Sequence, residues 1–550
     1  MDNMQNNIPT EPLHGGEKMG GNTPPLAENK KKTREYGAAE VVFAWLCFLF
    51  GYLFCRVFPV VESPFGGFLF IIVLFAATAI VLKVKGVKIG VLPAVMAGVA
   101  VALSASLVLS SNSFLYWLAY AFALCTYCYF VVSACGNTVK KGFSGLIAAD
   151  YFNAMFAYPF TSVKCAFEAA FSGKAAKKSG KAVLKVLLGA FVALVPTLVV
   201  GLLLSYDKGF NELMGKIFDF NFGDIFSHIF SILFGLLVGA YFYGIYISAA
   251  DKKLQWNITQ ESCERTAKQM RIAPALSVSA ACVPMLFVYV VFFISQWKYY
   301  VSGFTGVLPE EFSYAEYARE GFFQLCAVAF INLAVIICIS LFMRRKTEKA
   351  PVLLKGLTIV YSVFTLVLIS TALSKMFMYI ESYGLTQKRV YSTFMMFALA
   401  ALFVLLIIKQ FVPKTAAVAF SLVASLALFA LLSLGNIDGI IARYNVDRYI
   451  DGSLPTVDIE AMENLGDAAV PELVRLAKYL DEKNGTNIAD GKNSEGDELY
   501  GALICSLQEK AVYMRSARDL RGREPLAEFF AFNLPERRAE KAMESTGLLD

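Results

Sequence analysis

The feature that most constrains this chain is a series of apolar runs, each close to 20 residues long. Lipid tails offer the backbone no hydrogen-bond partner, so a run of about 20 apolar residues crosses a bilayer as a helix whose polar backbone groups pair within the segment. Eleven such runs occur, at about 37–58, 66–82, 89–110, 113–134, 183–205, 226–250, 273–296, 321–342, 352–374, 390–410 and 415–435. The sequence therefore predicts an all-α fold, a polytopic helical membrane bundle of about eleven spans.

Composition supports a membrane protein and leaves little material for two common kinds of active site. Hydrophobic residues make up 57% of the chain and charged residues 17%, whereas soluble domains carry about a quarter charged residues. The two histidines, His14 and His228, are too few for a histidine-ligated metal or a Ser-His-Asp triad. Cys125 and Cys128 lie one turn apart inside a predicted span, where packing is favoured over a zinc or redox pair. We predict no catalytic residue, no metal site and no cofactor.

The charged residues outside the runs predict the orientation. Residues 1–35 are rich in Asn, Gly, Pro and Lys, and we expect a disordered cytoplasmic leader before a transmembrane bundle over 36–435. Of the 36 lysines and arginines before residue 436, about 28 fall on the leader's side when eleven spans are counted, which is the positive-inside pattern. Residues 436–550, with 22 acidic and 14 basic side chains, are then extracytoplasmic. The expected location is the cell membrane.

The inner segment 135–182 is long for a loop and mixes aromatic with charged residues. This pattern fits one or two interfacial helices that lie in the headgroup plane and are broken at Pro159. A surface connector is the simpler interpretation, and a platform for a lipid substrate is the alternative.

The tail 436–550 is expected to be a small helical extracytoplasmic domain. Asp458 is placed to cap one helix, and Asp467 to cap a second one with Pro471 in its first turn. Two more helical stretches follow, at about 499–520 and 535–548.

Three outer segments each place an arginine, a carboxylate and tyrosines just beyond an apolar run. Aromatic residues are common at that depth, and arginines there reach the headgroups, so membrane anchoring is one interpretation. The other is a shared polar pocket in which guanidinium groups bind an anion, or in which the glutamates are their salt-bridge partners. The candidate ligand-binding residues are Glu316, Arg319, Glu381, Arg389, Asn445 and Arg448.

The same outer segments carry the motifs of a bacterial family. These motifs are Tyr-Ala-Glu-Tyr-Ala-Arg-Glu-Gly-Phe-Phe at 314–323, Tyr-Gly-Leu-Thr at 383–386 with Arg389, the stretch 445–449, and the turn Leu-Gly-Asp-Ala-Ala-Val-Pro at 465–471. Here the chain resembles a group of multi-pass membrane proteins catalogued only as domains of unknown function, DUF4153 and DUF4173, over roughly residues 180 to 545. The resemblance implies an integral membrane protein with extracytoplasmic motifs and no established activity. It supplies no catalytic residue.

Three functions are compatible with the sequence. The first is a non-enzymatic envelope protein, sensing or structural, with an unknown ligand or protein partner at the outer face. The second is a transporter or flippase of an amphiphile, which a mid-membrane cavity at Asn332 and Thr365 would support, although hydrogen bonding between helices is the simpler role for Asn332. The third is a membrane transferase with Glu316 or Glu381 as base. The lipid bilayer is an expected partner and nucleic acid is not, because the basic residues follow the topology.

Overall fold

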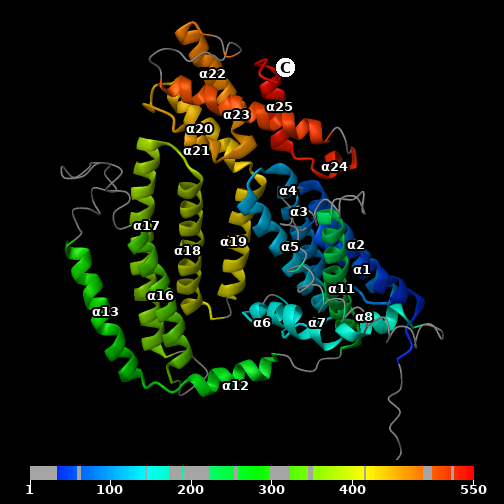
Figure 1. Ribbon diagram of the computed structural model, residues 1–550. Helices are drawn as coiled ribbons and strands as arrows, with labels where there is room; N and C mark the ends of the chain where they lie inside the picture. Colours follow the sequence, from blue (N-terminus) through cyan, green and yellow to red (C-terminus); the bar gives the residue numbers. More distant parts are fainter. Residues whose placement is uncertain are drawn as a thin grey trace, which may run out of the picture.

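The computed structural model describes residues 34–57, 63–140, 145–172, 222–252, 258–295, 322–344, 351–413, 416–486, 498–521 and 525–549, with a few isolated positions between them. In this part of the chain the regular elements are helices, apart from an isolated bridge between Ala273 and Met343 (Figure 1). The all-α prediction is confirmed.

Ten of the described helices are long and apolar enough to cross a membrane, and all ten match apolar runs of the sequence. The remaining predicted run, 183–205, lies outside the described residues. The ten spans are α1 (Ala38–Val57), α2 (Pro64–Val84), α3 with α4 (Val91–Ser104 and Ser106–Leu109), α5 (Ser113–Ala134), α11 (Phe222–Asp251), α13 (Ala275–Ser295), α16 (Phe322–Phe342), α17 (Val352–Tyr383), α18 (Gln387–Phe411) and α19 (Ala417–Leu434). The chain is a multi-pass membrane protein.

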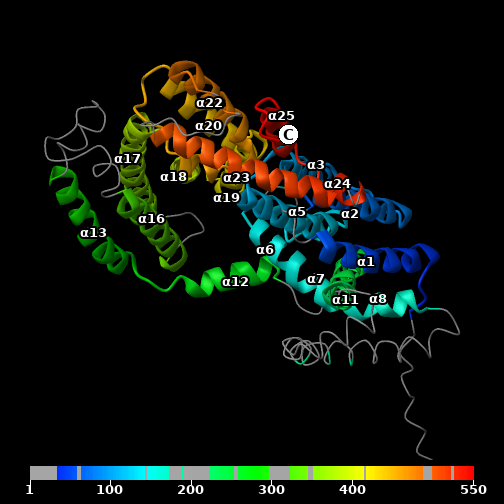
Figure 2. The same cartoon turned by 45° about the horizontal axis from the view of Figure 1, so that its top comes forward.

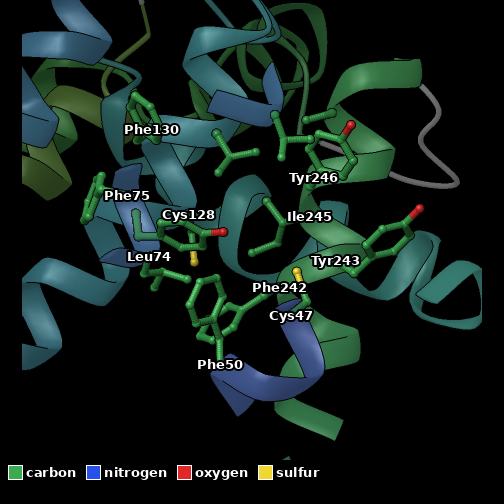
Figure 3. Close-up of a cluster of buried hydrophobic side chains, with 14 of the residues drawn as sticks. Cys47, Phe50, Leu74, Phe75, Cys128, Phe130, Phe242, Tyr243, Ile245 and Tyr246 are labelled. Atoms are coloured by element: carbon green, nitrogen blue, oxygen red, sulfur yellow. The ribbon is translucent and has the colours of Figure 1, made fainter. Parts of the chain in front are cut away.

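The helices α1 to α5 and α11 pack into a first group (Figure 1). Glycines allow α1 and α11 to approach closely, because a Cβ at Gly239 would lie 2.5 Å from the carbonyl oxygen of Cys47 and one at Gly235 would lie 2.7 Å from the backbone nitrogen of Tyr52. The interior of this group is rich in aromatic residues. Figure 3 shows part of it, formed by Cys47, Phe50, Leu74, Phe75, Cys128, Phe130, Phe242, Tyr243, Ile245 and Tyr246.

Four charged side chains join the start of α1 to the ends of α2 and α11. The carboxylate of Glu40 lies 2.5 Å from Lys85 Nζ and 2.9 Å from Arg34 Nη2, and its side chain is only 8% exposed. Asp251 pairs with the same two cations. A buried carboxylate without such partners would be strongly destabilising. We call this end of the membrane helices the far side.

The helices α13, α16, α17 and α18 form a second group, in which a buried polar chain joins α13, α16 and α17. Tyr289 Oη donates to Asn332 Oδ1 at 2.6 Å, and Asn332 Nδ2 donates to Thr365 Oγ1 at 2.9 Å. Asn332 and Thr365 have no exposed surface, so the helices are closed at this place, and the predicted interhelical role of Asn332 is confirmed. Helix α19 packs on α18 and also reaches α3 and α4 of the first group.

Short helices lie along the far side, and they correct one prediction. They are α6 (Ile147–Phe152), the π-helical turn η1 (Asn153–Ala157), α7 (Tyr158–Thr161), α8 (Val163–Ala170) and α12 (Gln260–Met270). The predicted break at Pro159 is wrong, because helical structure continues through Pro159 and the break comes at Ser162. Proline has no N–H for the Met155 carbonyl four residues back, and the hydroxyl of Tyr241 donates to that oxygen at 2.8 Å instead.

The remaining helices cover the opposite end, which we call the cap side (Figures 1 and 2). This cap consists of α20 (Ile437–Ile450), α21 (Ile459–Glu463), the 3₁₀ turn η2 (Gly466–Ala468), α22 (Val470–Asn484), α23 (Glu498–Arg521), α24 (Pro525–Phe530) and α25 (Leu534–Glu544). Figure 2 shows α23 and α24 crossing from the second group to α2 of the first, and α24 contacts α2.

The caps of two of these helices were predicted, one correctly. Asp458 caps α21 by accepting the Ala461 N–H at 2.9 Å, as expected. The prediction that Asp467 caps the next helix is wrong, since η2 intervenes and α22 begins after Ala469. Asp467 lies instead 2.6 Å from Lys510 Nζ, which ties η2 to α23.

Candidate functional site

Four of the six candidate residues lie around one corner of the cap side, where α17 ends and α18 begins. Helix α17 has 32 residues, or about 48 Å of helix, against about 30 Å of hydrocarbon, so its last turns are long enough to project beyond the bilayer. Glu381 lies in its last turn, Arg389 in the first turn of α18, and Asn445 and Arg448 on α20. The other two candidates, Glu316 and Arg319, lie outside the described residues.

Arg389 holds the end of α17 from the side of α18. Its Nη1 donates to the carbonyl oxygen of Tyr383 at 2.9 Å and to that of Gly384, and its guanidinium lies 4.0 Å from the ring centroid of Tyr379. The last four carbonyl groups of a helix have no partner within the helix and carry partial negative charge. A cation at this position therefore satisfies the helix end, and the aromatic ring adds a cation–π contact.

Arg448 holds the same helix end from the cap. Its Nη1 donates to the carbonyl oxygen of Glu381 at 2.7 Å. Its Nε and Nη2 donate to the hydroxyl and carbonyl oxygens of Ser453, at 3.0 and 2.9 Å. The planar fork of the guanidinium thus joins the end of α17 to the turn after α20.

Asn445 completes the corner by pairing with the backbone of Leu385. Its Oδ1 accepts the Leu385 N–H at 2.7 Å, and its Nδ2 donates to the Leu385 carbonyl at 2.8 Å. The preceding residue, Gly384, has a φ of +74°, a region that favours glycine, and a Cβ there would collide with Asn445 Oδ1. The sequence Tyr-Gly-Leu-Thr at 383–386 therefore fits the shape of this turn.

We call Arg389, Asn445 and Arg448 the corner clamp. The hydrogen bonds above direct its polar groups mainly to the backbone of residues 380–385 and to Ser453, so the clamp fixes the corner through contacts within the chain. Glu381, by contrast, contributes its carbonyl oxygen to the clamp while its residue is exposed. Ligand binding by these residues stays a prediction.

A buried carboxylate missed by the sequence reasoning lies nearby. Asp438, in the first turn of α20, is 1% exposed. Its Oδ1 accepts from Gln387 Nε2 at 3.0 Å and its Oδ2 from Asn112 Nδ2 at 3.1 Å. Burial raises the pKa of Asp438 above its ordinary value, against the lowering effect of these two hydrogen bonds. The one signal in the sequence is an acidic residue just after the last apolar run, and its partner Asn112 is 326 positions away.

Asparagine side chains also join the cap to the first group of helices. Asn112, the N-cap of α5, donates to the hydroxyl of Tyr391 on α18 at 2.7 Å. Asn533, the N-cap of α25, donates to the hydroxyl of Tyr116 at 2.6 Å and to the carbonyl oxygen of Ser110 at 2.7 Å. We call Asn112, Asp438 and Asn533, with their partners, the cap junction. It connects the cap with both groups of membrane helices.

A cleft of about 370 Å³ opens at the foot of the cap, where α19 gives way to α20. The residues of its lining that matter below are Asn436, Gly439, Ile440, Arg443, Glu472 and Arg538. Both arginines are exposed, whereas Glu472 is partly buried, and burial raises its pKa. The cleft combines cationic side chains with a position directly at the end of a membrane helix. Sequence reasoning did not single out any of these residues.

The structure places the paired cysteines in a packed environment. Cys128 is buried and its Sγ lies 3.7 Å from the hydroxyl of Tyr241, while Cys125 is partly buried. In the described residues, no three His, Cys, Asp or Glu side chains are gathered so that they could hold a metal ion.

A comparison with known protein families finds a match for this chain. A family model described as a domain of unknown function, DUF4153, matches residues 97–476, from α3 into α22. The match includes the corner clamp and Asp438, and it begins and ends earlier than the resemblance over roughly 180 to 545. No curated protein and no solved structure matches the chain. The matched residues make up more than half of the chain, which therefore belongs to the DUF4153 family.

Proposed function

We propose that the protein is a binding or sensing protein whose ligand site lies on the cap side, and that this side is extracytoplasmic. The observation that carries the proposal is the cap junction, in which buried hydrogen bonds join the cap to both groups of membrane helices. A ligand that binds one arrangement of the cap better than another shifts the equilibrium between them. Through the junction, that shift reaches both helix groups.

Charge supports the proposed orientation. Residues 436–550 carry a net charge of −8, from 22 acidic and 14 basic side chains. The far side is basic, with Lys83 and Lys85 at the end of α2, Lys268 in the last turn of α12 and Lys409 in the last turn of α18. Cytoplasmic ends of membrane helices are enriched in lysine and arginine.

The six candidate residues enter this proposal as the surroundings of the ligand site. The corner clamp keeps the end of α17 in a fixed position beside the cap, and Glu381 presents an exposed carboxylate there. Glu316 and Arg319 are proposed to belong to the same outer surface. A clamp built from backbone contacts would transmit a movement of the cap to α17 and α18 without itself touching the ligand.

Complementation of a deletion strain tests this function. The variants Asn112→Ala and Asn533→Ala remove buried donors of the cap junction. We expect them to insert in the membrane at normal levels but to lose complementation. Tyr36→Phe, which removes a far-side hydrogen bond to Glu168 at 3.0 Å, is the matched control and should complement fully. Full complementation by both junction variants would refute the proposed function.

A transporter or flippase of an amphiphile is the second candidate. The observation that favours it is the division of the membrane helices into two groups bridged by α19 and the cap. The buried hydrogen bonds of Asn332 with Tyr289 and Thr365 hold the helices together at mid-membrane. They argue against a substrate path at this place in the structure. Translocation of fluorescent lipids in liposomes containing the purified protein separates the two candidates, because a sensing protein leaves the rate at the protein-free level.

A further inference from the structure

The cleft at the foot of the cap has three properties that together define a type of ligand. The first is the position of the cleft relative to the membrane. Gly435, the C-cap of α19, and Asn436 line it, so the cleft begins where a membrane helix ends, at the level of lipid headgroups. Leu431 and Leu434 on α19 are 63% and 36% exposed, so the last turn of α19 presents apolar surface next to the cleft. An amphiphile is therefore suited to this place.

The second property is positive charge. Arg443 and Arg538 line the cleft, and both side chains are exposed. Arg443 has a 70% exposed side chain and lies 3.6 Å from Asp447, a pair too open to water to hold it firmly. The carboxylate of Glu472 lies 3.1 Å from Arg475, which offsets its charge. Guanidinium groups bind phosphate oxygens through parallel N–H bonds.

The third property is an acceptor without a donor. Asn436 adopts a left-handed backbone conformation with φ of +46°, and its Oδ1 is buried without a hydrogen-bond partner among the described residues. A buried acceptor left unpaired is costly. A hydroxyl or amine of a ligand in the cleft would provide the missing donor.

From these observations we propose that the cleft binds the headgroup of a phospholipid, with Arg443 and Arg538 holding the phosphate and Asn436 Oδ1 accepting a hydrogen bond from a headgroup hydroxyl or amine. The acyl chains lie along the end of α19. This inference deepens the proposed function by naming the ligand class of the cap side. It predicts a preference for phosphatidylglycerol and phosphatidylethanolamine over phosphatidylcholine, whose headgroup has no donor.

The test is native mass spectrometry of the purified full-length chain with each of these lipids. The double variant Arg443→Ala/Arg538→Ala should lower the affinity for phosphatidylglycerol by about tenfold or more. Lys483→Ala/Lys541→Ala removes the same charge from exposed cap residues and should leave the affinity unchanged. Equal affinities of the two double variants would overturn the proposal. Thermal unfolding of each variant tests whether the cap remains folded.

Two further arms separate the parts of the inference. Asn436→Ala should remove the preference over phosphatidylcholine, and a preference that survives would refute the role of Asn436. Glycerol phosphate tests the lipid source, since binding as tight as that of phosphatidylglycerol would show that the site takes a soluble phosphate instead. Failure of lipid binding, with complementation still dependent on the cap junction, refutes this inference and leaves the proposed function standing. If the protein binds lipid but both junction variants complement fully, the proposed function is refuted and the lipid-binding inference stands.

Discussion

At Asp438, burial and hydrogen bonding have opposite effects on the pKa of the carboxyl group. Its carboxylate accepts two hydrogen bonds, from Gln387 and Asn112, yet burial still raises its pKa. A group whose pKa is higher in the folded than in the unfolded state adds stability below its unfolded pKa and loses that contribution as the pH rises through the folded pKa. The cap junction is therefore stabilised by protonation of Asp438 at acidic pH.

We accordingly expect the apparent Tm of the wild-type protein in detergent to fall as the pH rises through the raised pKa of Asp438. Asp438→Asn cannot titrate, so the difference in Tm between wild type and this variant should change over that pH interval. Glu381→Gln, at an exposed position, is the control and should follow the wild-type profile. A constant difference between wild type and Asp438→Asn across the interval would rule out Asp438 as the titrating group.

The corner clamp gives a second prediction at the level of one side chain. Arg448→Ala leaves the carbonyl oxygens of Glu381 and Ser453 without this donor, and we expect a loss of about 1–3 kcal/mol in stability. Hydrogen exchange of the amides at 380–386 should become faster with no ligand present. Lys388→Ala, an exposed neighbour, should change stability by less than about 0.5 kcal/mol. Unchanged exchange at the corner in Arg448→Ala would show that the clamp does not hold it.

Among whole elements, the sequence predicted best those features that depend on residues close together in the chain. Ten of the apolar runs appear as helices of suitable length because lipid leaves the backbone no alternative. Asp458 was found as a cap for a similar local reason, since its partner is three residues away. The same reasoning failed for Asp467 and Pro159, where a contact from another helix, Lys510 or Tyr241, decides the local structure.

The candidate site was less predictable for the same physical reason. The sequence indicated that Arg389, Asn445 and Arg448 matter, but not that their partners are backbone groups of one corner. That depends on α17 projecting far enough to meet α20, which is a property of the packed molecule. Asp438 and the cleft combine residues from distant helices, and no periodicity marks them.

The crossing of α1 and α11 yields a prediction for a pair of elements. Gly239→Ala places a Cβ 2.5 Å from the Cys47 carbonyl oxygen and 2.7 Å from Phe48 Cα, so the helices must move apart. We expect a loss of about 1–3 kcal/mol, measured by thermal unfolding in detergent. Gly356→Ala in α17 meets nothing within 4 Å and should be neutral or stabilising through helix propensity. Equal stability of the two variants would show that the glycines are not needed for this approach.

At the scale of the whole molecule, the far-side charges constrain the path of the chain. Arg34 pairs with Asp251, so the start of α1 and the end of α11 lie at the same end of the membrane helices. An even number of crossings is needed for that, and α1, α2, α3 with α4, α5 and α11 provide five. The sequence analysis predicts a further run at 183–205, which lies outside the described residues and stays a prediction.

Native cysteines allow the resulting topology to be measured. Cys263 lies on α12 at the far side and Cys505 is exposed on α23 of the cap, with five described spans between them, α13 and α16 to α19. An odd number of crossings puts the two thiols on opposite sides of the membrane. In variants whose single remaining cysteine is Cys263 or Cys505, a membrane-impermeant maleimide should label Cys505 in intact cells and Cys263 only after permeabilisation. Labelling of Cys263 but not Cys505 in intact cells would place the cap in the cytoplasm, and labelling of both from one side would contradict the five crossings themselves.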